Sequence, residues 1–422
     1  MSTVLYQPGK AWKIGMLLAL FMMINFIDKV VIGLVAVPMM KELGLSPSEF
    51  GLIGGSFFWL FAIAGIAGGF LSDHIKTKWF LAVMALFWAA LQFPIFFATS
   101  LVGVIIFRFL LGVAEGPAWP VAVHALYKWF PDDKRTLPVS VMAQSAGVGL
   151  ILAGIFIPLI SEHWGWRMNF VVLGLLGLVW LLVWLPFGRE GKIGQHANTA
   201  VQNSKTPYTR ILKDKTLLTC IFMHFTSYWS LAITLTWMPA YIEKGLGFSA
   251  IQAGRMFSLF IIVNLIAALA AAWLSQHLLQ RGSSSRNARG RLTAVAAVTA
   301  AVCYASLLLP ELGALERIII VGIGAGLSQC IYFTGPAMIG EFTPVTQRGS
   351  VLAIDNSVAS IAGILAPVVT GFLIQYVVGA TPATGYEYGF AVTGAILAFG
   401  GIIGWLLLDP RSAARRLLSV RG

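Results

Sequence analysis

Twelve apolar stretches, each about as long as a membrane-spanning helix, restrict the fold of this chain more than any other feature. An α-helix needs about 20 residues to cross the ~30 Å hydrocarbon layer of a bilayer. Stretches of this kind lie near 12–37, 51–72, 79–99, 102–126, 137–160, 169–187, 217–242, 252–278, 292–310, 317–340, 350–376 and 387–408. The sequence therefore predicts an all-α membrane protein with twelve transmembrane helices.

The composition agrees with lipid as the solvent of this chain. Of its 422 residues, 58% are apolar and only 11% are charged, and the mean hydropathy is +0.82. A soluble domain needs far more polar and charged side chains to cover its surface. The three cysteines lie inside apolar stretches without metal-ligand spacing, so buried thiols are expected. We expect no metal and no cofactor, and a proton gradient as the energy source.

The distribution of Lys and Arg predicts the orientation in the membrane. With both termini in the cytoplasm, 22 of the 29 Lys and Arg residues fall in cytoplasmic segments and five in outer ones. Cytoplasmic loops of membrane proteins carry such an excess. The remaining two, Lys29 and Arg108, lie inside apolar stretches. Orientation and attraction to anionic lipid thus explain the net charge of +12 without a nucleic-acid partner.

A polar segment at 189–215 divides the spans into six and six, and we interpret it as a flexible or surface-lying cytoplasmic tether. The predicted organisation is an N-terminal six-helix bundle at 1–188, this linker, and a C-terminal six-helix bundle with a short cytoplasmic tail at 216–422.

Two pairs of segments repeat weakly between the halves. The first pair reads GFLSDHIKTK at 69–78 and AWLSQHLLQR at 272–281. The second reads FPDDKR at 130–135 and EFTPVTQR at 341–348, each with a proline four residues before an arginine. Both pairs occur in the same order and in corresponding loops. Such parallel halves are typical of one transporter architecture, with two pseudo-symmetric bundles.

On these features the chain resembles the major facilitator superfamily over essentially its full length. In the loop motif of that superfamily, Gly69 and Asp73 match. His74 replaces the usual basic residue, and Lys76 stands where the second glycine is expected. The resemblance implies the twelve-helix fold of that superfamily, with a monomer as the default state. It implies a latch role for Asp73 between the halves.

Within the superfamily the chain is similar to the anion:cation symporter group, which includes bacterial permeases for sugar acids and other carboxylates. The segments that carry this similarity are NFIDKV at 25–30, FRFLLGVAEGPAWP at 107–120, the Pro131–Arg135 motif and DNSVASIAGILAP at 355–367. The group usually has Asn-Tyr-x-Asp-Arg in its first helix, whereas Phe26 and Lys29 fill two of those places here. A bacterial inner membrane is the location that this group implies.

Four ionisable residues lie well inside apolar spans of the first half: Asp28, Lys29, Arg108 and Glu115. A charged side chain costs about 2.5–3.5 kcal/mol at the bilayer centre on insertion scales, so a functional role is the default interpretation. The alternative is that the four only pair with one another and hold helices together. Two acids and two bases sum to zero charge, as a buried resting site requires.

Helical geometry predicts that these four residues form one cluster. Arg108 and Glu115 are seven apart, so two helical turns bring them to nearly the same face. Measured from the outer interface, Asp28 and Arg108 lie at similar depth, while Glu115 lies nearer the midplane. Asp28 can therefore reach Arg108 if the first and fourth spans are neighbours, as the resemblance implies.

The cluster suggests how an anion and a proton enter together. Lys29 and Arg108 can bind a substrate carboxylate only when the two acids release them, and protonation of the acids removes their negative charge. The resemblance implies these roles: Asp28 and Glu115 carry protons, the basic residue at 29 follows the first acid, and Arg108 assists. Replacement of Arg by Lys at 29 exchanges a bidentate fork for a point charge.

Weaker predictions concern the substrate pocket. Phe61 occupies a place where sugar-acid permeases tend to have Tyr, which suggests a less hydroxylated or more apolar substrate. Gln144 and Asn356 are amides in mid-span that suit hydrogen bonding to substrate hydroxyl groups, with interhelical contacts as the alternative. Thr334 is a further candidate lining residue, with core packing as the favoured explanation.

The remaining polar residues have structural explanations at this stage. Asp355 could be a third proton site, but a solvated or Arg-paired acid near the inner interface is favoured. His124 and His224 are lone histidines, for which structural roles are expected. Arg135 belongs to the motif that follows the fourth span, and Pro117 and Pro120 should loosen the inner half of that span.

The predicted function is import of a small organic anion, a sugar acid or another carboxylate, by proton symport and alternating access. The main alternative is a proton-coupled exporter of drugs or metabolites, against which the two intramembrane cations argue. Sodium coupling stays open. A non-transporting sensor would need an output domain, and an enzyme would need a nucleophile or metal motif, which the sequence lacks.

Overall fold

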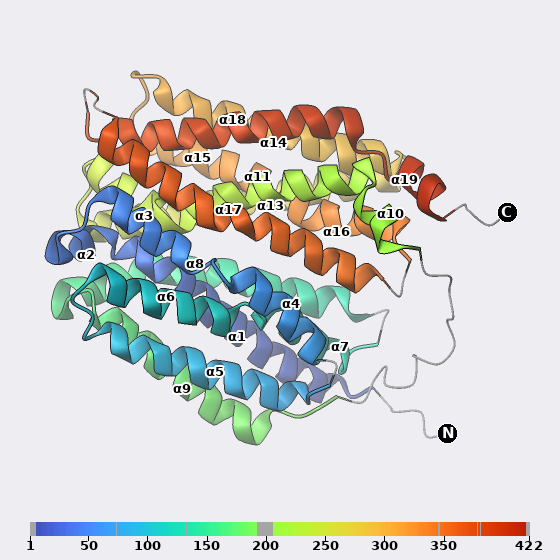
Figure 1. The fold of residues 1–422 in the computed structure, drawn as a ribbon, viewed down its shortest axis with the longest axis horizontal. Helices are drawn as coiled ribbons and strands as arrows, with labels where there is room; N and C mark the ends of the chain where they lie inside the picture. The colour runs from blue at the N-terminus through green and yellow to red at the C-terminus, as the bar shows by residue number, and fades with distance from the viewer. Residues whose placement is uncertain are drawn as a thin grey trace. The chain divides into compact units, whose positions relative to one another are not determined.

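A computed structural model describes residues 6–72, 74–131, 134–191, 206–344, 347–377, 379 and 381–418. Regular structure in these ranges is helical throughout (Figure 1). Twelve helical segments among them are long and apolar enough to cross a membrane, from Pro8–Leu34 to Thr384–Leu407. The prediction of an all-α protein with twelve spans is confirmed, with shifts of a few residues at the ends.

The described residues before the linker contain nine helices. They are α1 (Pro8–Leu34), α2 (Ala36–Leu43), α3 (Pro47–Ser56), α4 (Phe61–Ser72), α5 (Thr77–Ile95), α6 (Leu101–Glu115), α7 (Ala118–Tyr127), α8 (Thr136–Trp164) and α9 (Met168–Phe187). Helix α1 packs on α7, α8 and α9, and α6 packs on α4 and α5.

The remaining described helices follow the linker. They are α10 (Tyr208–Leu212), α11 (Lys215–Thr236), α12 (Met238–Ala240), the π-helix η3 (Tyr241–Gly245), α13 (Ala250–Gln280), the π-helix η4 (Arg286–Arg291), α14 (Leu292–Ala305), the 3₁₀-helix η5 (Ser306–Leu308), α15 (Ala314–Ser328), α16 (Cys330–Phe342), α17 (Arg348–Tyr376), α18 (Thr384–Leu407) and α19 (Pro410–Leu418). Helix α11 packs on α16, α17 and α18, and α14 packs on α15 and α18.

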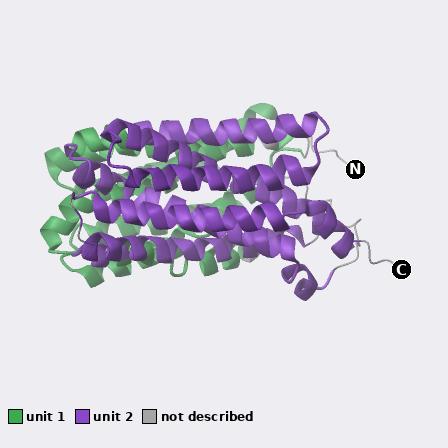
Figure 2. Ribbon diagram, turned by 90° about the horizontal axis from the view of Figure 1, so that it is seen from above, with its two compact units in different colours: residues 1–45, 52–202, 250–258 green, residues 46–51, 203–249, 259–422 purple. Residues whose placement is uncertain are grey.

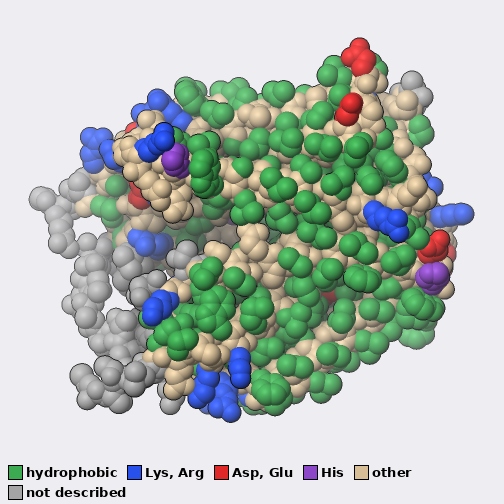
Figure 3. All heavy atoms as spheres, turned by 180° about the vertical axis from the view of Figure 1, so that it is seen from behind, with side chains coloured by type: hydrophobic (Ala, Val, Ile, Leu, Met, Phe, Trp, Pro, Cys, Tyr) green, Lys and Arg blue, Asp and Glu red, His purple; other side chains and the backbone are tan. Residues whose placement is uncertain are grey.

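The surface of the helices carries apolar side chains, as a lipid-facing surface requires. Phe97, Leu182 and Trp273 are examples, each with more than half of its side chain exposed. In Figure 3 such side chains cover the helix faces, while charged side chains gather toward the helix ends.

The chain divides into two compact units (Figure 2). Unit 1 contains residues 1–45, 52–202 and 250–258, and unit 2 contains residues 46–51, 203–249 and 259–422. The start of α3 thus belongs to unit 2, where Ser48 N donates to Gln375 Oε1. The start of α13 belongs to unit 1, where Ser258 Oγ donates to the Ile151 carbonyl oxygen. Most of the predicted linker, 192–205, lies outside the described residues.

The fourth span is interrupted where its prolines predicted a weak point. Helix α6 ends at Glu115 and α7 begins at Ala118, with Gly116 and Pro117 between them. A Cβ atom on Gly112 would overlap the carbonyl oxygen of Phe57, in the break between α3 and α4. Glycine at 112 therefore allows the second and fourth spans to touch next to Arg108 and Glu115.

Candidate functional site

The four predicted intramembrane charges form one buried cluster in unit 1. Helix α1 carries Asp28 and Lys29, and α6 carries Arg108 and Glu115. Asp28 and Glu115 are fully buried, Arg108 is 2% exposed, and the Lys29 side chain is 10% exposed. The chain therefore concentrates two acids and two bases inside one helical unit, with no net charge among the four.

A single amide connects the acid of α6 to the base of α1. Asn25 Nδ2 donates to Glu115 Oε2 at 2.7 Å, and Lys29 Nζ donates to Asn25 Oδ1 at 2.6 Å. The Lys29 ammonium group lies 4.0 Å from Glu115 Oε2. Residues four apart share a helix face, so Asn25 is well placed between Lys29 and Glu115. Lys29 is thus held by a neutral amide and interacts with Glu115 at longer range.

The Arg108 side chain contacts the main-chain carbonyl group of Asp28 and not its carboxyl group. Its Nη1 lies 3.5 Å from the main-chain carbonyl oxygen of Asp28, and its guanidinium lies 4.8 Å from the centre of the Phe57 ring. Among the described residues, Arg108 has no carboxylate oxygen within 4 Å. The predicted proximity of Asp28 and Arg108 is therefore found, but the aromatic ring and the backbone take the place of a direct ion pair.

Neither carboxyl oxygen of Asp28 meets a described donor at full hydrogen-bond geometry, and the Gln92 side chain lies beside it as a hydrogen-bonding group. Gln92 belongs to α5, and both of its amide atoms also lack a described partner at that geometry. Glu115 Oε1 and Arg108 Nε are likewise unpartnered. Most buried polar atoms in proteins are hydrogen-bonded, so a group of open atoms around four charges indicates a site that binds something.

Three aromatic rings surround the Lys29 ammonium group. The ring centres of Phe26, Phe61 and Phe57 lie 4.7, 5.2 and 6.0 Å from Nζ. An ammonium group is attracted to an aromatic face at such distances. Phe26 and Lys29, the two departures from the usual first-helix pattern, are therefore in contact with each other. Phe61 lies in this part of the site and is 8% exposed.

Other predicted pocket residues have mixed surroundings. Gln144 on α8 is exposed, in unit 1. Asn356 on α17 is exposed, in unit 2. Thr334 on α16 is buried in unit 2, and its hydroxyl lies 2.7 Å from Thr293 Oγ1 and donates to the Cys330 carbonyl oxygen. Its hydrogen bonds are already used, as the packing alternative for Thr334 expects.

The two motif arginines hold the ends of corresponding helices. Arg135 donates to the carbonyl oxygens of Phe130 and Tyr127, at the end of α7. Arg348 donates to the carbonyl oxygen of Gly340, in the last turn of α16. A cation at a helix C-terminus satisfies free carbonyl groups and complements the helix dipole. The second predicted gating residue, Asp73, lies outside the described residues.

Asp355 has different surroundings from those expected. It is 3% exposed, and its Oδ2 lies 2.8 Å from His224 Nδ1. The expectation of a solvated or Arg-paired acid is therefore wrong, as is that of a lone His224. His224 lies nine residues from the start of α11, and Asp355 lies seven residues from the start of α17. Both side chains are therefore at similar depth inside unit 2. Spacing within either helix alone could not reveal this pairing.

Sequence reasoning also missed Asn25 and Gln92. Asn25 stands four residues before Lys29, and this spacing was an available signal. Gln92 is fully buried in α5. It is an isolated amide in an apolar stretch, and only the packing of α5 places it next to Asp28.

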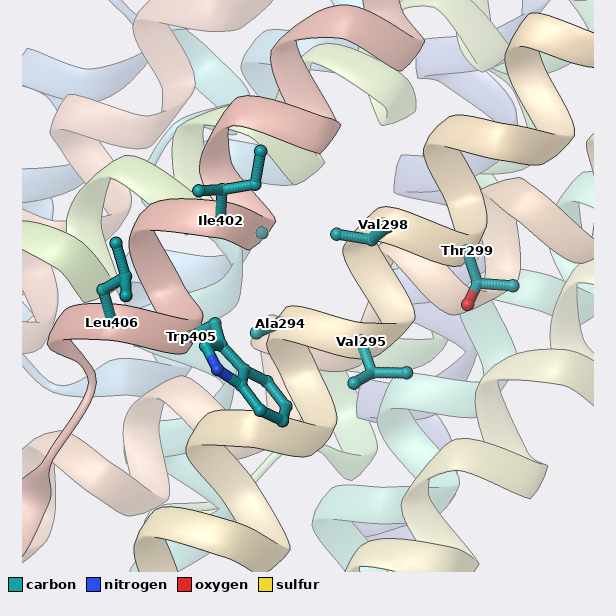
Figure 4. Close-up of a pocket in the computed structure, with 8 residues that line it drawn as sticks. Ala294, Val295, Val298, Thr299, Ile402, Trp405 and Leu406 are labelled. Carbon is teal, nitrogen blue, oxygen red and sulfur yellow. The ribbon is translucent and has the colours of Figure 1, made fainter.

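Two surface hollows lie in unit 2. The first, about 280 Å³, is lined by Ala294, Val295, Val298, Thr299, Gly401, Ile402, Trp405 and Leu406 (Figure 4). Apart from the Thr299 hydroxyl its side chains are nearly all apolar, which suits lipid and not an anion. The second, about 530 Å³, is lined by Arg210, Lys213, Asp214, Lys215, Arg415, Arg416 and Leu417.

The chain matches the sequence profile of the Major Facilitator Superfamily over residues 18–336. Its curated relatives include a probable sulfoacetate transporter of Cupriavidus necator, 27% identical over 93% of this chain and 92% of that one. A hexuronate transporter of Bacillus subtilis is 26% identical over 86% and 88% of the two chains. A D-galactonate transporter of Escherichia coli is 23% identical over 92% and 95%.

The fold also matches solved transporters. A bacterial homologue of the human lysosomal transporter Spinster, in an inward-facing and occupied conformation, superposes with a TM-score of 0.78 over 99% of both chains at 18% identity. A D-xylose–proton symporter superposes with a TM-score of 0.72 over 95% of this chain and 99% of that one at 14% identity. The predicted family and fold are confirmed, and the relatives agree with its anion symporter group: this chain belongs to the Major Facilitator Superfamily and is a membrane transporter, not an enzyme.

Proposed function

We propose that this transporter imports a small organic anion together with protons by alternating access. The observation that carries the proposal is the buried chain Lys29–Asn25–Glu115, with Asp28 and Arg108 beside it. Four charged groups in a membrane interior are costly, and they are retained where they bind ions or substrates. The family provides the transport function, and the cluster supports the choice of cargo.

Lys29 and Arg108 are the cationic partners of the substrate. In the present arrangement Lys29 donates to Asn25 Oδ1 and lies 4.0 Å from Glu115, so its link to the acid is indirect. A proton on Glu115 cancels the charge that attracts Lys29. The ammonium group is then free to turn toward a substrate carboxylate or sulfonate, and the proton enters with the anion.

Asp28 is the second proton carrier in this scheme. Its carboxyl group is fully buried without a described donor at full hydrogen-bond geometry, and the guanidinium of Arg108 lies on its backbone carbonyl. Protonation of Asp28 together with Glu115 leaves Arg108 with no charged acid that competes with the substrate. Both acids thus control the same two cations, which couples anion binding to proton binding.

The aromatic surroundings of Lys29 favour a compact anion with few hydroxyl groups. Phe26, Phe57 and Phe61 enclose the ammonium group without offering a hydroxyl donor. Sulfoacetate, which one relative is named for, carries two anionic groups and no alcohol. Galactonate, which another relative is named for, carries several hydroxyl groups. We therefore rank small carboxylates and sulfonates above sugar acids.

The orientation belongs to the same proposal. The excess of Lys and Arg in alternate connections supports termini on the cytoplasmic side of a bacterial inner membrane. Import then brings the anion and its protons toward the cytoplasm.

Uptake of radiolabelled substrates into proteoliposomes tests the proposal. The panel contains sulfoacetate, a hexuronate, galactonate and a lipophilic cation, with and without an inward proton gradient, in sodium-free and sodium-containing buffer. We expect uptake of at least one anion, driven by the proton gradient and independent of sodium. Lys29→Gln should abolish it, whereas His163→Gln, at an exposed position of α8, should not. Transport of the cation alone would contradict the proposal and favour the exporter.

A further inference from the structure

We propose that the His224–Asp355 pair of unit 2 is a second proton-binding site, separate from the acids of α1 and α6. His224 comes from α11 and Asp355 from α17, and Nδ1 lies 2.8 Å from Oδ2. Their side chains are 8% and 4% exposed. The inference rests on the proposed function in one respect only: a further proton, in addition to those on Asp28 and Glu115, is carried with the same anion.

The charge of the pair requires one bound proton. Asp355 has no other ion-pair partner among the residues that the structure describes. A lone carboxylate in a buried site costs several kcal/mol relative to water. The pair avoids this cost either as imidazolium and carboxylate or as neutral imidazole and carboxylic acid. Each form contains one shared proton, and loss of that proton leaves an uncompensated negative charge.

The titratable groups around the pair cannot replace that proton. On α11, Cys220 and Tyr228 lie one turn before and one turn after His224. From α16, the Tyr332 ring meets the imidazole edge-on with centroids 4.8 Å apart. These groups are neutral when protonated, so none supplies a positive charge to Asp355.

The charged residues of the neighbouring helices are engaged elsewhere. Arg317 of α15 pairs with Glu387 of α18, Glu341 of α16 pairs with Arg289, and Arg348 of α17 donates to the Gly340 carbonyl oxygen. Glu316 of α15 accepts from Gly313 N. At the start of α11, Asp214 pairs with Arg416 of α19. Among the described residues, none of these charged groups forms an ion pair with Asp355.

A comparison within unit 2 separates this pair from a structural ion pair. Arg317, which pairs with Glu387, also donates to the carbonyl oxygens of Leu307, Leu309 and Leu312, so all its nitrogens are used. His224 Nε2 and Asp355 Oδ1 are buried without any hydrogen-bond partner among the described residues. A purely structural pair normally has its remaining polar atoms satisfied. Open atoms on both partners indicate that the pair changes its protonation.

The depth of the pair suits proton release toward the cytoplasm. His224 lies nine residues, or about 14 Å, from the start of α11, and Asp355 lies seven residues, or about 10 Å, from the start of α17. Both helices begin at the end that we assign to the cytoplasm. A proton held here is thus near the side on which import ends.

Infrared difference spectra between about pH 5 and pH 8 test the site on the full-length protein in nanodiscs. We expect a carboxyl band in the wild-type spectrum that is lost in Asp355→Asn and displaced in His224→Gln. The exposed His163→Gln variant should leave the band in place. If Asp355→Asn does not fold, Asp355→Glu keeps the acid at a changed distance, and a displaced band is expected. An unchanged band in the variants that fold overturns the proposal.

The transport measurement distinguishes failure of this site from failure of the proposed function. In proteoliposomes that take up the anion, the number of protons per anion should fall by one in His224→Gln. The same ratio in His224→Gln and wild type contradicts a further proton carried by this pair. If no anion is transported at all, the proposed function fails, and the infrared result still decides whether the pair binds a proton.

Discussion

Asn25 of α1 and Glu115 of α6 are joined by a hydrogen bond of 2.7 Å, across 90 residues of sequence. The other side of the same amide accepts from Lys29. Asn25 therefore sets how closely the base of α1 approaches the acid of α6. A neutral side chain thus determines the distance between Lys29 and Glu115 within the charged cluster.

Asn25→Ala should destabilise the protein and reduce anion uptake. It removes the donor of a fully buried carboxylate, and a hydrogen bond to a charged group contributes about 1.5–3 kcal/mol. Thermal unfolding in detergent and initial uptake rates would measure the two effects. The control is Asn287→Ala, an exposed amide that accepts from Arg291. Wild-type uptake in Asn25→Ala would remove Asn25 from the site.

Gly112→Ala should damage the site through the backbone. The added methyl group overlaps the Phe57 carbonyl oxygen and pushes the Phe57 ring away from Arg108 and Lys29. Overpacking of this kind costs about 1–3 kcal/mol, and we expect the apparent affinity for the anion to fall with the stability. Gly349→Ala enters open space at the start of α17 and should leave both unchanged. Equal behaviour of the two variants would disprove the close contact.

Phe61→Tyr should shift specificity toward hydroxylated anions. The ring lies 5.2 Å from the Lys29 ammonium group, so a phenol places one new donor near the bound substrate. One neutral hydrogen bond contributes about 0.5–1.5 kcal/mol, which corresponds to a gain of about two- to tenfold. Competition between galactonate and sulfoacetate uptake measures the ratio. An unchanged ratio would place the hydroxyl end of the substrate away from Phe61.

Glu190, which lies near the ends of helices in the N-terminal half, should make the stability of the protein depend on pH. It lies beyond α9, accepts from Thr77 N and Lys78 N at the start of α5, and accepts from Lys128 at 2.5 Å. Partial burial acts to raise the pKa of Glu190, but these hydrogen bonds outweigh it and hold the pKa below its ordinary value of 4.5.

Because the folded pKa is lowered, the stabilisation by Glu190 is present above the unfolded value and is lost as the pH falls through the folded pKa. Glu190→Gln should therefore melt at a lower temperature than wild type at pH 7, with the difference shrinking as the pH falls below about 4.5. Glu162→Gln, at an exposed position of α8, is the control. A difference that is independent of pH would assign the effect to packing.

Much of the fold was predictable because lipid imposes a simple rule. Only helices satisfy their own backbone in a bilayer, so length and hydropathy alone located all twelve spans. The break after Glu115 was predictable from Pro117, which cannot donate a backbone hydrogen bond. The motif arginines, Arg135 and Arg348, were recognised as a repeat, and both donate to backbone carbonyl groups at helix ends.

The site was predictable only for charged residues that lie inside an apolar span. Charges such as Asp28 and Glu115 stand out in an apolar span, whereas the partner of each charge depends on how helices rotate against one another. Arg108 lies on Phe57 and a backbone carbonyl instead of a carboxylate, and Asp355 meets His224 of another helix. These choices depend on contacts between residues that are 51 to 131 positions apart, which helical periodicity does not encode.

The most direct test of the central claim is proton uptake by proteoliposomes on addition of the transported anion, with Asp28→Asn and Glu115→Gln beside wild type. We predict that the anion drives protons inward in wild type, and that each variant still exchanges internal for external anion but loses net proton movement. Anion-driven proton entry that is the same in wild type and both variants would contradict the assignment of Asp28 and Glu115 as the proton carriers.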